Sequence, residues 1–416
     1  MALRGSFAPP GDKSISHRLA LFSLLGRGRM EISNFSPCAD AAASLAAARL
    51  LGAKVEETAG TLVITGAGGR IRPEARIDCA NSGTTIRLLM GLLAGAGGPY
   101  LLTGDESLRQ RPMERVAKPL RRMGAGITTD QGRPPLTVRG GPLTGIKYNL
   151  PMASAQLKTA LLLAGLQARG RTRLIEPGPS RDHTERLLRA WGADLEKKGP
   201  VLELKPSRLN LPARFRVPGD ASSAAFFTVA AAVIPGSRVE ATNVLLNPTR
   251  TGFLQVLRRM GALVEVVEEG HEPEPWGRIK VSFGPDLKGC RISGRELPLL
   301  LDEVPILALA ASQAVGETVF EEAGELRHKE SDRLSAVASQ LSALGGRVGI
   351  QGDDLVIQGP ARLEPVSRLD SFGDHRMAMA LRLAALLAGG EPRIRGEESA
   401  AVSYPGFGEE LTRLAD

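Results

Sequence analysis

The stretch 374–389, DHRMAMALRLAALLAG, shows the pattern that decides the fold. It begins with an acidic residue that can cap a helix, continues with apolar residues on every side, and ends at glycine. A helix that is apolar all round must be buried. Similar stretches recur roughly every seventy residues. They are KSISHRLALFSLLG (13–26, after Asp12), NSGTTIRLLMGLLAG (81–95), SAQLKTALLLAG (154–165), DASSAAFFTVAAAVIPG (220–236) and DEVPILALAASQAVG (302–316).

A second kind of helix alternates with the first. Amphipathic stretches end in a Gly-Ala or Gly-Gly step, as in LAAARLLGA (45–53) and VLRRMGA (256–262). Each is followed by two short strands across a turn, as in KVEETAGTLVITG (54–66). The repeating unit is therefore predicted to be a buried helix, a strand, a surface helix and a β-hairpin. Six such units fill the chain, with the last one truncated.

The length of 416 residues exceeds the size at which one hydrophobic core stops growing, so two domains are expected. Three units per domain explain the repeat better than a stacked solenoid, which is the alternative. Pro-Gly breaks near 9–11 and 217–219 mark the linkers. We predict an α/β (α+β) fold of two similar domains. The first domain is residues 12–216, and the second is residues 1–11 together with 217–416.

Composition restricts the functions that the chain can have. The formal charge is +8, with Lys and Arg along the whole chain and no basic run, which favours an anion-binding cleft over a basic tail. Only 4% of residues are aromatic, which argues against a stacking platform for single-stranded nucleic acid. Three isolated cysteines and five histidines show no metal-ligand spacing. With no signal peptide or membrane-spanning stretch, we expect a soluble, cytoplasmic protein.

The charges at the starts of the buried helices are unusual. Lys13, Arg87, Lys158 and Arg376 each lie in the first turns of such a helix. A cation there opposes the helix dipole at a cost of about 0.3–1 kcal/mol, so a counter-anion is implied. Helix N-termini also bind phosphate and carboxylate groups. If these starts converge, they form one anion-binding cleft.

The acidic residues at the same starts have two possible roles. Asp12, Asn81, Asp220, Asp302 and Asp374 can simply cap helices, and for Asp12 and Asp220 that interpretation is favoured. For Asp302, which lies between LPLLL and EVPILALAA, a chemical role is equally well supported by the spacing. Gly11-Asp12-Lys13-Ser14 lacks the Gly-Lys step of a phosphate-binding P-loop, and no dinucleotide fingerprint follows a strand.

Seven motifs taken together resemble the family of 5-enolpyruvylshikimate-3-phosphate synthases along the whole chain. They are GDKSISHR (11–18), NSGTTIRLL (81–89), RQRP (109–112), SAQLKTA (154–160), LLLDE (299–303), KESDRL (329–334) and DHRMAMA (374–380). The resemblance implies two domains of three βαβαββ units each, an inside-out α/β barrel with an interdomain cleft. This agrees with the repeats.

The resemblance also implies a reaction. The enolpyruvyl group of phosphoenolpyruvate moves to the 5-hydroxyl of shikimate 3-phosphate, with release of phosphate, by addition and elimination. The family uses no metal or cofactor and is the target of glyphosate. We therefore expect two small-molecule substrates, no nucleic-acid or membrane partner, and a monomer. The sister enzyme that acts on UDP-N-acetylglucosamine and an RNA-end-binding repeat protein are the alternatives.

Matched to the family motifs, individual residues receive roles. The resemblance implies that Asp302 is the base, Glu330 a proton donor, and Lys13 a contact to both substrates. The implied shikimate 3-phosphate ligands are Lys13, Ser14, Arg18, Ser154, Gln156, Arg181, Asp302 and Lys329. The implied phosphoenolpyruvate ligands are Lys13, Asn81, Gly83, Thr84, Arg111, Gln156, Arg333 and Arg376, with Asp374 and His375 in support.

The sequence departs from the family pattern at two positions. Ala155 stands where many members have a second serine before the glutamine. Val402 stands where many have a lysine before the aromatic-Pro pair, here Tyr404-Pro405. Each change removes one polar group that other members bring to their substrates.

Overall fold

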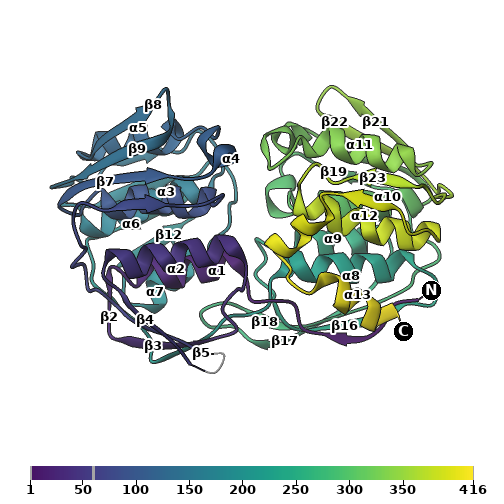
Figure 1. Ribbon diagram of the computed structural model, residues 1–416, viewed down its shortest axis with the longest axis horizontal. Helices are drawn as coiled ribbons and strands as arrows, with labels where there is room; N and C mark the ends of the chain where they lie inside the picture. Colours follow the sequence, from purple (N-terminus) through teal and green to yellow (C-terminus); the bar gives the residue numbers. More distant parts are fainter. Residues whose placement is uncertain (1, 59–60, 416) are drawn as a thin grey trace. The chain divides into compact units, whose positions relative to one another are not determined.

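A computed structural model describes residues 2–58 and 61–415. Its contacts divide the chain into two compact units (Figure 1). One is Gly11–Val217, here called the 11–217 unit, and the other is Met1–Pro10 with Pro218–Asp416, here called the split unit. The chain passes from one unit to the other at the two breaks that contain proline and glycine.

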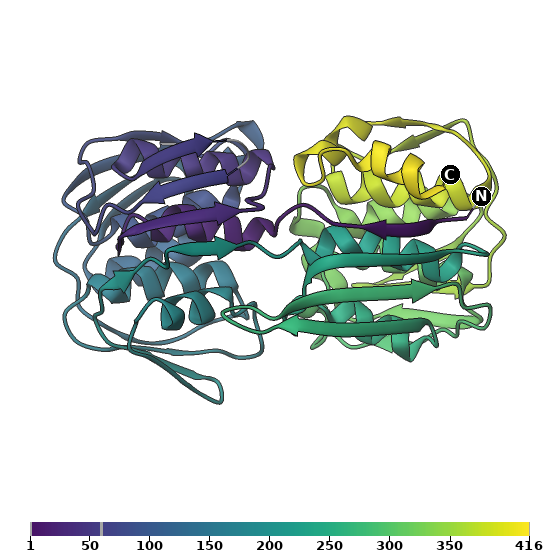
Figure 2. The ribbon, with the colours of Figure 1, turned by 90° about the horizontal axis from the view of Figure 1, so that it is seen from below.

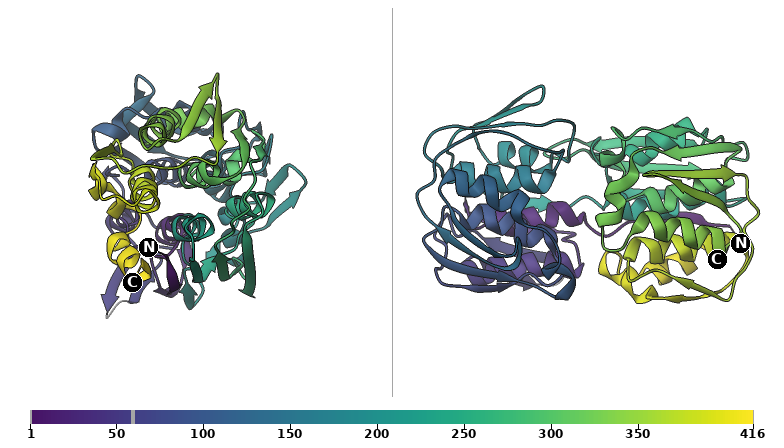
Figure 3. Two further views of the ribbon diagram at one scale, coloured as in Figure 1. Left: turned by 90° about the vertical axis from the view of Figure 1, so that its right-hand side faces the viewer. Right: turned by 90° about the horizontal axis from the view of Figure 1, so that it is seen from above.

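Six buried helices appear where the repeats predicted them. In each unit the three helices lie on the inside and the sheets on the outside, as Figure 3 shows. In the longest stretch, Ala221–Val233, every residue is buried. The buried helices of the 11–217 unit are α1 (Lys13–Phe22), α3 (Gly83–Leu93) and α6 (Ala155–Gln167). Those of the split unit are α8 (Ala221–Val233), α10 (Val304–Gln313) and α12 (His375–Ala388).

The caps of these helices differ from the expected ones at two places. The side chains of Asp12, Ser154, Asp220 and Asp374 accept first-turn N–H groups as expected. However, α3 is capped by Ser82 rather than Asn81, and α10 follows Glu303 without a side-chain cap. Capping is therefore the wrong interpretation for Asn81 and Asp302. Their side chains lie just outside the helix and bond to other groups.

The sheets repeat one order of strands. An edge strand runs parallel to the second, which is antiparallel to one strand of a hairpin. In the 11–217 unit the sheets are β15 (Arg214–Arg216)–β3 (Arg29–Ser33)–β5 (Thr61–Thr65)–β4 (Lys54–Thr58), β6 (Arg76–Asp78)–β7 (Gly98–Thr103)–β9 (Arg133–Gly140)–β8 (Gly126–Asp130), and β10 (Lys147–Asn149)–β11 (Thr172–Ile175)–β13 (Val201–Leu204)–β12 (Leu195–Lys198). A short pair, β2 (Gly26–Arg27) and β14 (Leu209–Asn210), accompanies them. The turn predicted between β4 and β5, at 59–60, lies outside the described residues.

The split unit follows the same plan. Its sheets are β1 (Arg4–Phe7)–β16 (Arg238–Leu245)–β18 (Trp276–Ser282)–β17 (Leu263–Gly270), β19 (Arg291–Ile292)–β20 (Gly316–Phe320)–β22 (Asp354–Gly359)–β21 (Arg347–Gln351), and β23 (Arg368–Asp370)–β24 (Arg393–Arg395). The last sheet has no hairpin, so the sixth repeat is truncated as predicted.

In each repeat, the strand named second in its sheet is followed along the chain by a surface helix. These helices are α2 (Ala39–Leu51), α5 (Glu114–Met123), α7 (His183–Ala190), α9 (Gly252–Arg259), α11 (Arg333–Ala343) and α13 (Phe407–Ala415). Shorter turns complete the set: α4 (Glu106–Arg109), η1 (Leu297–Leu299), η2 (Ala323–His328) and η3 (Glu397–Val402). The alternation of buried and surface helices is therefore confirmed.

Each unit closes its first sheet with a strand that lies next to a linker. Strand β1 precedes the first crossing, and it pairs in parallel with β16, Arg4 facing Arg238. Strand β15 precedes the second crossing, and it pairs in parallel with β3 (Figure 2). Both linkers are thus held by backbone hydrogen bonds on the side from which the chain leaves. This pairing explains why the split unit needs the first ten residues.

The contact between α3 and α6 can be tested. A Cβ added at Gly91 would lie 2.1 Å from the Ala160 carbonyl oxygen of α6, and backbone cannot move aside. Gly91→Ala should therefore lower the free energy of unfolding by about 1–3 kcal/mol, measured by urea denaturation. Gly97→Ala is the control, because a Cβ there meets nothing within 4 Å. Equal denaturation midpoints for the two variants would contradict the close packing.

Candidate active site

The residues singled out by the sequence form two clusters, one in each unit. We call the first the basic cluster, and it comprises Lys13, Arg18, Asn81, Gly83, Thr84, Arg87, Arg111, Ser154 and Gln156. We call the second the carboxylate cluster, and it comprises Asp302, Glu330, Arg333, Asp374 and Arg376. Most members of both clusters lie at or next to the start of a buried helix. Each cluster is described here within its own unit.

Arg87 connects the basic cluster. Its Nη1 donates to Gln156 Oε1 at 2.8 Å, and Gln156 Nε2 donates to Thr84 Oγ1 at 3.1 Å. Nearby, Arg111 Nη2 donates to Asn81 Oδ1 at 2.6 Å. The starts of α3 and α6 are therefore joined by amide and guanidinium groups. Arg87 lies in the predicted charge pattern, but the family motifs did not assign it a role.

The two guanidiniums flank the first residue of α3. A Cβ added at Gly83 would lie 2.8 Å from Arg87 Nη1 and 3.2 Å from Arg111 Nη1. Among the described residues, neither arginine forms an ion pair with a carboxylate. Burial, together with the Arg115 and Arg111 guanidiniums, lowers the pKa of Arg87 to about 9. An anion bound at this helix start would offset the excess positive charge.

Arg18 ties α1 to its neighbours. Its Nε donates to Thr184 Oγ1 at 2.8 Å and its Nη2 to Thr159 Oγ1 at 3.1 Å, while Nη1 donates to the Ser14 carbonyl at 2.8 Å. The two threonine hydroxyls lie 2.6 Å apart. This buried group fixes α1, α6 and α7 next to Ser154, the cap of α6.

Lys158 does not belong to the anion-seeking set, so that part of the prediction is wrong. Its side chain is fully buried, and Nζ lies 3.0 Å from Glu176 Oε1 and 2.6 Å from Glu185 Oε1. The reason is its place in α6, where the position points into the core instead of toward the helix start. Ser180 donates to Glu176 at 2.6 Å, which anchors the loop that carries Arg181.

Lys13 has a counter-anion inside the chain. Its Nζ lies 3.1 Å from Asp40 Oδ2, with both side chains mostly buried. The sequence implied such a partner for a cation at a helix start, but it did not identify Asp40. The available signal was an acidic residue in the first turn of the amphipathic helix α2, where the helix dipole favours it.

Arg333 is the centre of the carboxylate cluster. Its Nη1 lies 3.1 Å from Asp302 Oδ1, its Nη2 2.5 Å from Glu330 Oε2, and its Nε 2.7 Å from Asp374 Oδ2. Arg376 Nη2 lies 3.5 Å from the second oxygen of Asp302. The predicted acid–base residues and the predicted anion-binding arginines thus form one network.

Burial and ion pairing together shift the pKa values of Arg333 and Asp374. Burial alone would lower the pKa of Arg333, but Glu330, Asp374 and Asp302 raise it above its ordinary value. Burial alone would raise the pKa of Asp374, but the Arg333 guanidinium lowers it. Asp374 is fully buried, whereas the side chains of Asp302 and Glu330 stay 15% and 32% exposed. Those two carboxylates are the ones that a ligand can reach.

Two predicted residues lie beside the carboxylate cluster. Lys329 Nζ lies 3.5 Å from Glu325 Oε1. His375 is buried as the first residue of α12, directly after the Asp374 cap.

The formal charge is divided unequally between the units. The 11–217 unit has 32 Lys and Arg against 17 Asp and Glu, a formal charge of +15, whereas the split unit has 21 against 28, a charge of −7. Lys and Arg therefore occur in both units, but the excess of basic over acidic residues lies in the 11–217 unit. A field of one sign raises the local concentration of anions around the basic cluster.

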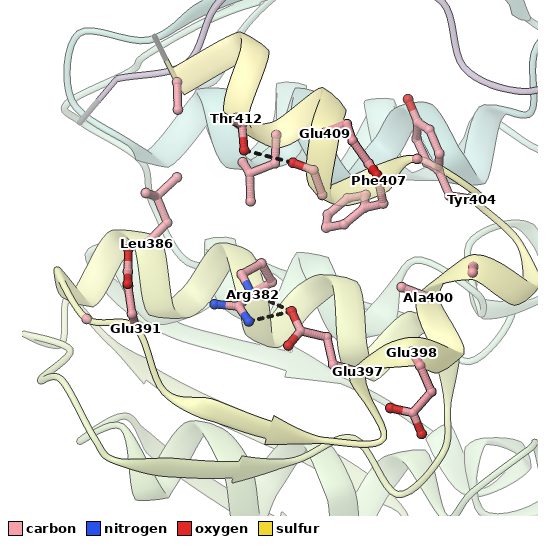
Figure 4. A pocket seen from close by; sticks show the side chains of 16 residues that line it. Arg382, Leu386, Glu391, Glu397, Glu398, Ala400, Tyr404, Phe407, Glu409 and Thr412 are labelled. Atoms are coloured by element: carbon pink, nitrogen blue, oxygen red, sulfur yellow. Dashed lines mark hydrogen bonds and ion pairs between the residues drawn. The ribbon is translucent and has the colours of Figure 1, made fainter.

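The pocket shown in Figure 4 has a volume of about 730 Å³ and lies apart from the predicted residues. It is formed by the second half of α12, η3 and α13, with Arg382 hydrogen-bonded to Glu397. Within the described residues, no helix has the length and apolar character needed to cross a membrane. Over the same residues, no three His, Cys, Asp or Glu side chains are grouped to hold a metal ion.

Comparisons with known proteins agree on one family. Residues 1–411 match the family model described as EPSP synthase (3-phosphoshikimate 1-carboxyvinyltransferase). A 3-phosphoshikimate 1-carboxyvinyltransferase of Bacillus velezensis is 45% identical, over 100% of this chain and 98% of its own. The structure of EPSP synthase from Acinetobacter baumannii has a TM-score of 0.89 at 41% identity and covers 99% of this chain and 96% of its own. The enolpyruvyl transferase NikO of Streptomyces tendae shares the fold, with a TM-score of 0.80 at 21% identity and coverage of 100% and 95%.

The Arg333 network makes a prediction about stability. Arg333→Met leaves Asp374 buried without its ion pair, which should lower the free energy of unfolding by about 3–5 kcal/mol at pH 7. In the wild type, the lowered pKa of Asp374 stabilises the fold above the ordinary carboxyl range, and this stabilisation is lost as the pH falls. In the variant, acid protonates Asp374 and relieves the buried charge, so the deficit should shrink toward pH 4. Urea denaturation at both pH values measures it.

Arg368→Met is the control, because Arg368 is exposed on β23. It should change stability by no more than about 0.5 kcal/mol. If Arg333→Met behaves like this control, or if its deficit grows in acid, the electrostatic account of the cluster is wrong.

Proposed function

The chain belongs to the EPSP synthase (3-phosphoshikimate 1-carboxyvinyltransferase) family, and on this premise we propose how its residues bind and convert their substrates. The enzyme transfers the enolpyruvyl group of phosphoenolpyruvate to the 5-hydroxyl of shikimate 3-phosphate and releases phosphate. Family membership over the full chain supports this function, and it does not support the UDP-N-acetylglucosamine or RNA-end-binding alternatives.

We assign the binding of phosphoenolpyruvate chiefly to the start of α3. Gly83 leaves room between Arg87 and Arg111, whose guanidiniums match phosphate and carboxylate in shape and charge. This arrangement is the single observation that best supports the assignment, because neither arginine forms an ion pair with a carboxylate among the described residues. Asn81, Thr84 and Gln156 orient the two arginines. Arg333 and Arg376 are assigned to the same substrate.

We assign the binding of shikimate 3-phosphate to the starts of α1 and α6. Ser14, Ser154 and Gln156 lie on these two helix ends, Arg18 lies one turn after Ser14 and bonds back to its carbonyl, and Arg181 lies on the anchored loop before α7. Free N–H groups at a helix start favour phosphate. Lys13 is assigned to both substrates, and Lys329 to shikimate 3-phosphate. The positive charge of the 11–217 unit supports capture of an anion there.

Asp302 is the proposed base. The ion pairs with Arg333 and Arg376 hold its carboxylate in place, and the side chain stays partly exposed. It removes the proton of the 5-hydroxyl while the oxygen attacks C2 of phosphoenolpyruvate. Glu330, the more exposed carboxylate, delivers a proton to the methylene carbon. This addition gives a tetrahedral intermediate.

Elimination completes the reaction. The C–O bond to phosphate breaks while the Glu330 carboxylate takes back one proton from the new methyl group, so the double bond forms again, and the proton held by Asp302 passes to the departing phosphate. The departing phosphate carries negative charge, which Lys13 and the arginines of the basic cluster stabilise. Asp374 and His375 are assigned a supporting role, because Asp374 holds Arg333 in place from the buried side.

We also propose that the protein is a cytoplasmic monomer that does not bind nucleic acid. The three free cysteines agree with a reducing compartment. The low aromatic content agrees with the absence of a stacking surface for bases.

The assignment of Asp302 can be tested through phosphate release with both substrates present. Asp302→Asn should lower kcat by about 100-fold or more, the usual scale for loss of an acid–base group. Asp286→Asn, a change at an exposed position of the same unit, should keep wild-type activity. A folded Asp302→Asn enzyme with full activity would refute the role of base. Absence of phosphate release by the wild type would refute the function itself.

The assignment of Gly83 can be tested by adding one methyl group. Because the atoms nearest to a Cβ are the ends of two flexible arginines, Gly83→Ala should fold normally but displace both guanidiniums. We expect the KM for phosphoenolpyruvate to rise about tenfold, which corresponds to roughly 1.4 kcal/mol. Gly408→Ala, early in α13 and with open space around it, is the control. An unchanged KM would place the substrate elsewhere.

A further inference from the structure

Two pairs of side chains join α1 to α2, one helical turn apart. The first pair is Lys13 and Asp40, whose Nζ and Oδ2 atoms lie 3.1 Å apart. The second pair is His17 and Ser44, whose Nδ1 and Oγ atoms lie 2.7 Å apart. On both helices the partners are four residues apart, so they lie on one face. The pairing therefore fixes the rotation of each helix start against the other.

The second pair extends into α3. Ser44 Oγ lies 2.8 Å from Thr85 Oγ1, which donates to Ser82 Oγ, the cap of α3, at 2.7 Å. All of these side chains are buried. One chain of hydrogen bonds thus runs from α1 through α2 to the helix start that carries Gly83. Helix α2 therefore supports two starts of the basic cluster, although it is a surface helix.

Asp40 is the anionic group that faces Lys13 from α2. Burial lowers the pKa of His17 to about 3, so its ring is neutral and does not compete for Asp40. Burial raises the pKa of the Cys38 thiol, which is also neutral near pH 7. On α1 itself, Asp12 caps the helix through Ile15 N and Arg18 bonds to Thr184. Helices α3 and α7 also pack against α1, where Thr85 of α3 bonds to Ser44 and Thr184 of α7 bonds to Arg18, and these hydroxyls do not titrate.

The helix dipoles explain why Lys13 is paired with Asp40. Lys13 is the first residue of α1, where the dipole disfavours a cation, whereas Asp40 is the second residue of α2, where the dipole favours an anion. Asp40 therefore compensates the unfavourable position of Lys13. It also gives the ammonium a fixed place beside the basic cluster.

We propose that Asp40 is a positioning residue for the transfer reaction, which keeps the Lys13 ammonium charged and aimed until the substrates are bound. The proposal rests on the role assigned to Lys13 above. It has a specific consequence, because the same carboxylate repels anionic substrates. Removal of Asp40 should therefore harm turnover without weakening binding.

The test uses Asp40→Asn, which keeps the shape and removes the charge. We expect kcat to fall about tenfold, while the KM for shikimate 3-phosphate stays the same or decreases. Without the carboxylate, the ammonium loses its proton more easily, so the alkaline limb of the kcat–pH profile should move about one pH unit lower. Asp40→Glu keeps the negative charge, so the alkaline limb of its kcat–pH profile should lie at the same pH as in the wild type. A purely structural role would not separate kcat from KM or move this limb.

Two further variants serve as controls. Glu57→Gln, an exposed position on β4 paired with Arg49, changes the charge of the same unit equally and should leave both kcat and the limb unchanged. Ser44→Ala removes the neutral pair and should lower the denaturation midpoint without moving the limb. If Asp40→Asn does not fold, Asp40→Ser provides the same comparison, because serine is accepted at a helix start.

The outcomes separate this proposal from the proposed function. If the wild type releases phosphate, and Asp40→Asn has an unchanged kcat and an unmoved alkaline limb, the proposed role of Asp40 is wrong. A limb that moves equally in Asp40→Glu and Asp40→Asn overturns it as well. Failure of the wild-type enzyme to release phosphate overturns the proposed function instead.

Discussion

A helix that is apolar on every side must be buried along its length, but its first turn still carries N–H groups without partners in the helix. Six such helices form the interior of this protein, so six polar ends must be accommodated at the edges of two cores. Short polar side chains satisfy part of this need, as Asp12, Ser154 and Asp374 do. The remaining dipole and N–H groups attract charge. The candidate active site is a consequence of this constraint, because the places that the core leaves unsatisfied are the places where we propose that anions bind.

The two units meet the constraint in opposite ways. In the split unit, Arg333 is surrounded by three carboxylates, so the charges at the starts of α11 and α12 are balanced within the protein. In the 11–217 unit, Arg87 and Arg111 are oriented by neutral amides, so their positive charge stays available. One unit therefore holds a network of paired charges, and the other keeps an excess of positive charge at its helix starts. The formal charges of −7 and +15 show the same division at the scale of whole units.

The sequence predicted the repeating elements well because they depend on local patterns. Apolar helices that end at glycine, and hairpins that follow amphipathic helices, were each recognisable within about fifteen residues. What failed depended on contacts between distant residues. Lys158 and Lys13 look alike as cations near a helix start, but only the packing of α7 against α6 buries Lys158 with Glu185. Asp40 was missed for the same reason, since nothing within α2 indicates that α1 will place a lysine beside it.

Arg333 connects the stability of the fold with the proposed reaction. A buried arginine with three carboxylates stabilises the fold only while every partner is in place, since breaking such a group leaves charge without solvent. Asp374 is the fully buried partner, so it holds the arginine from the core side, while Asp302 and Glu330 face outward and stay partly exposed. In the proposed reaction the exposed pair exchanges protons with a substrate, while Asp374 keeps the guanidinium fixed. The proposed reaction therefore depends on a division between one buried contact, which holds Arg333, and two partly exposed ones.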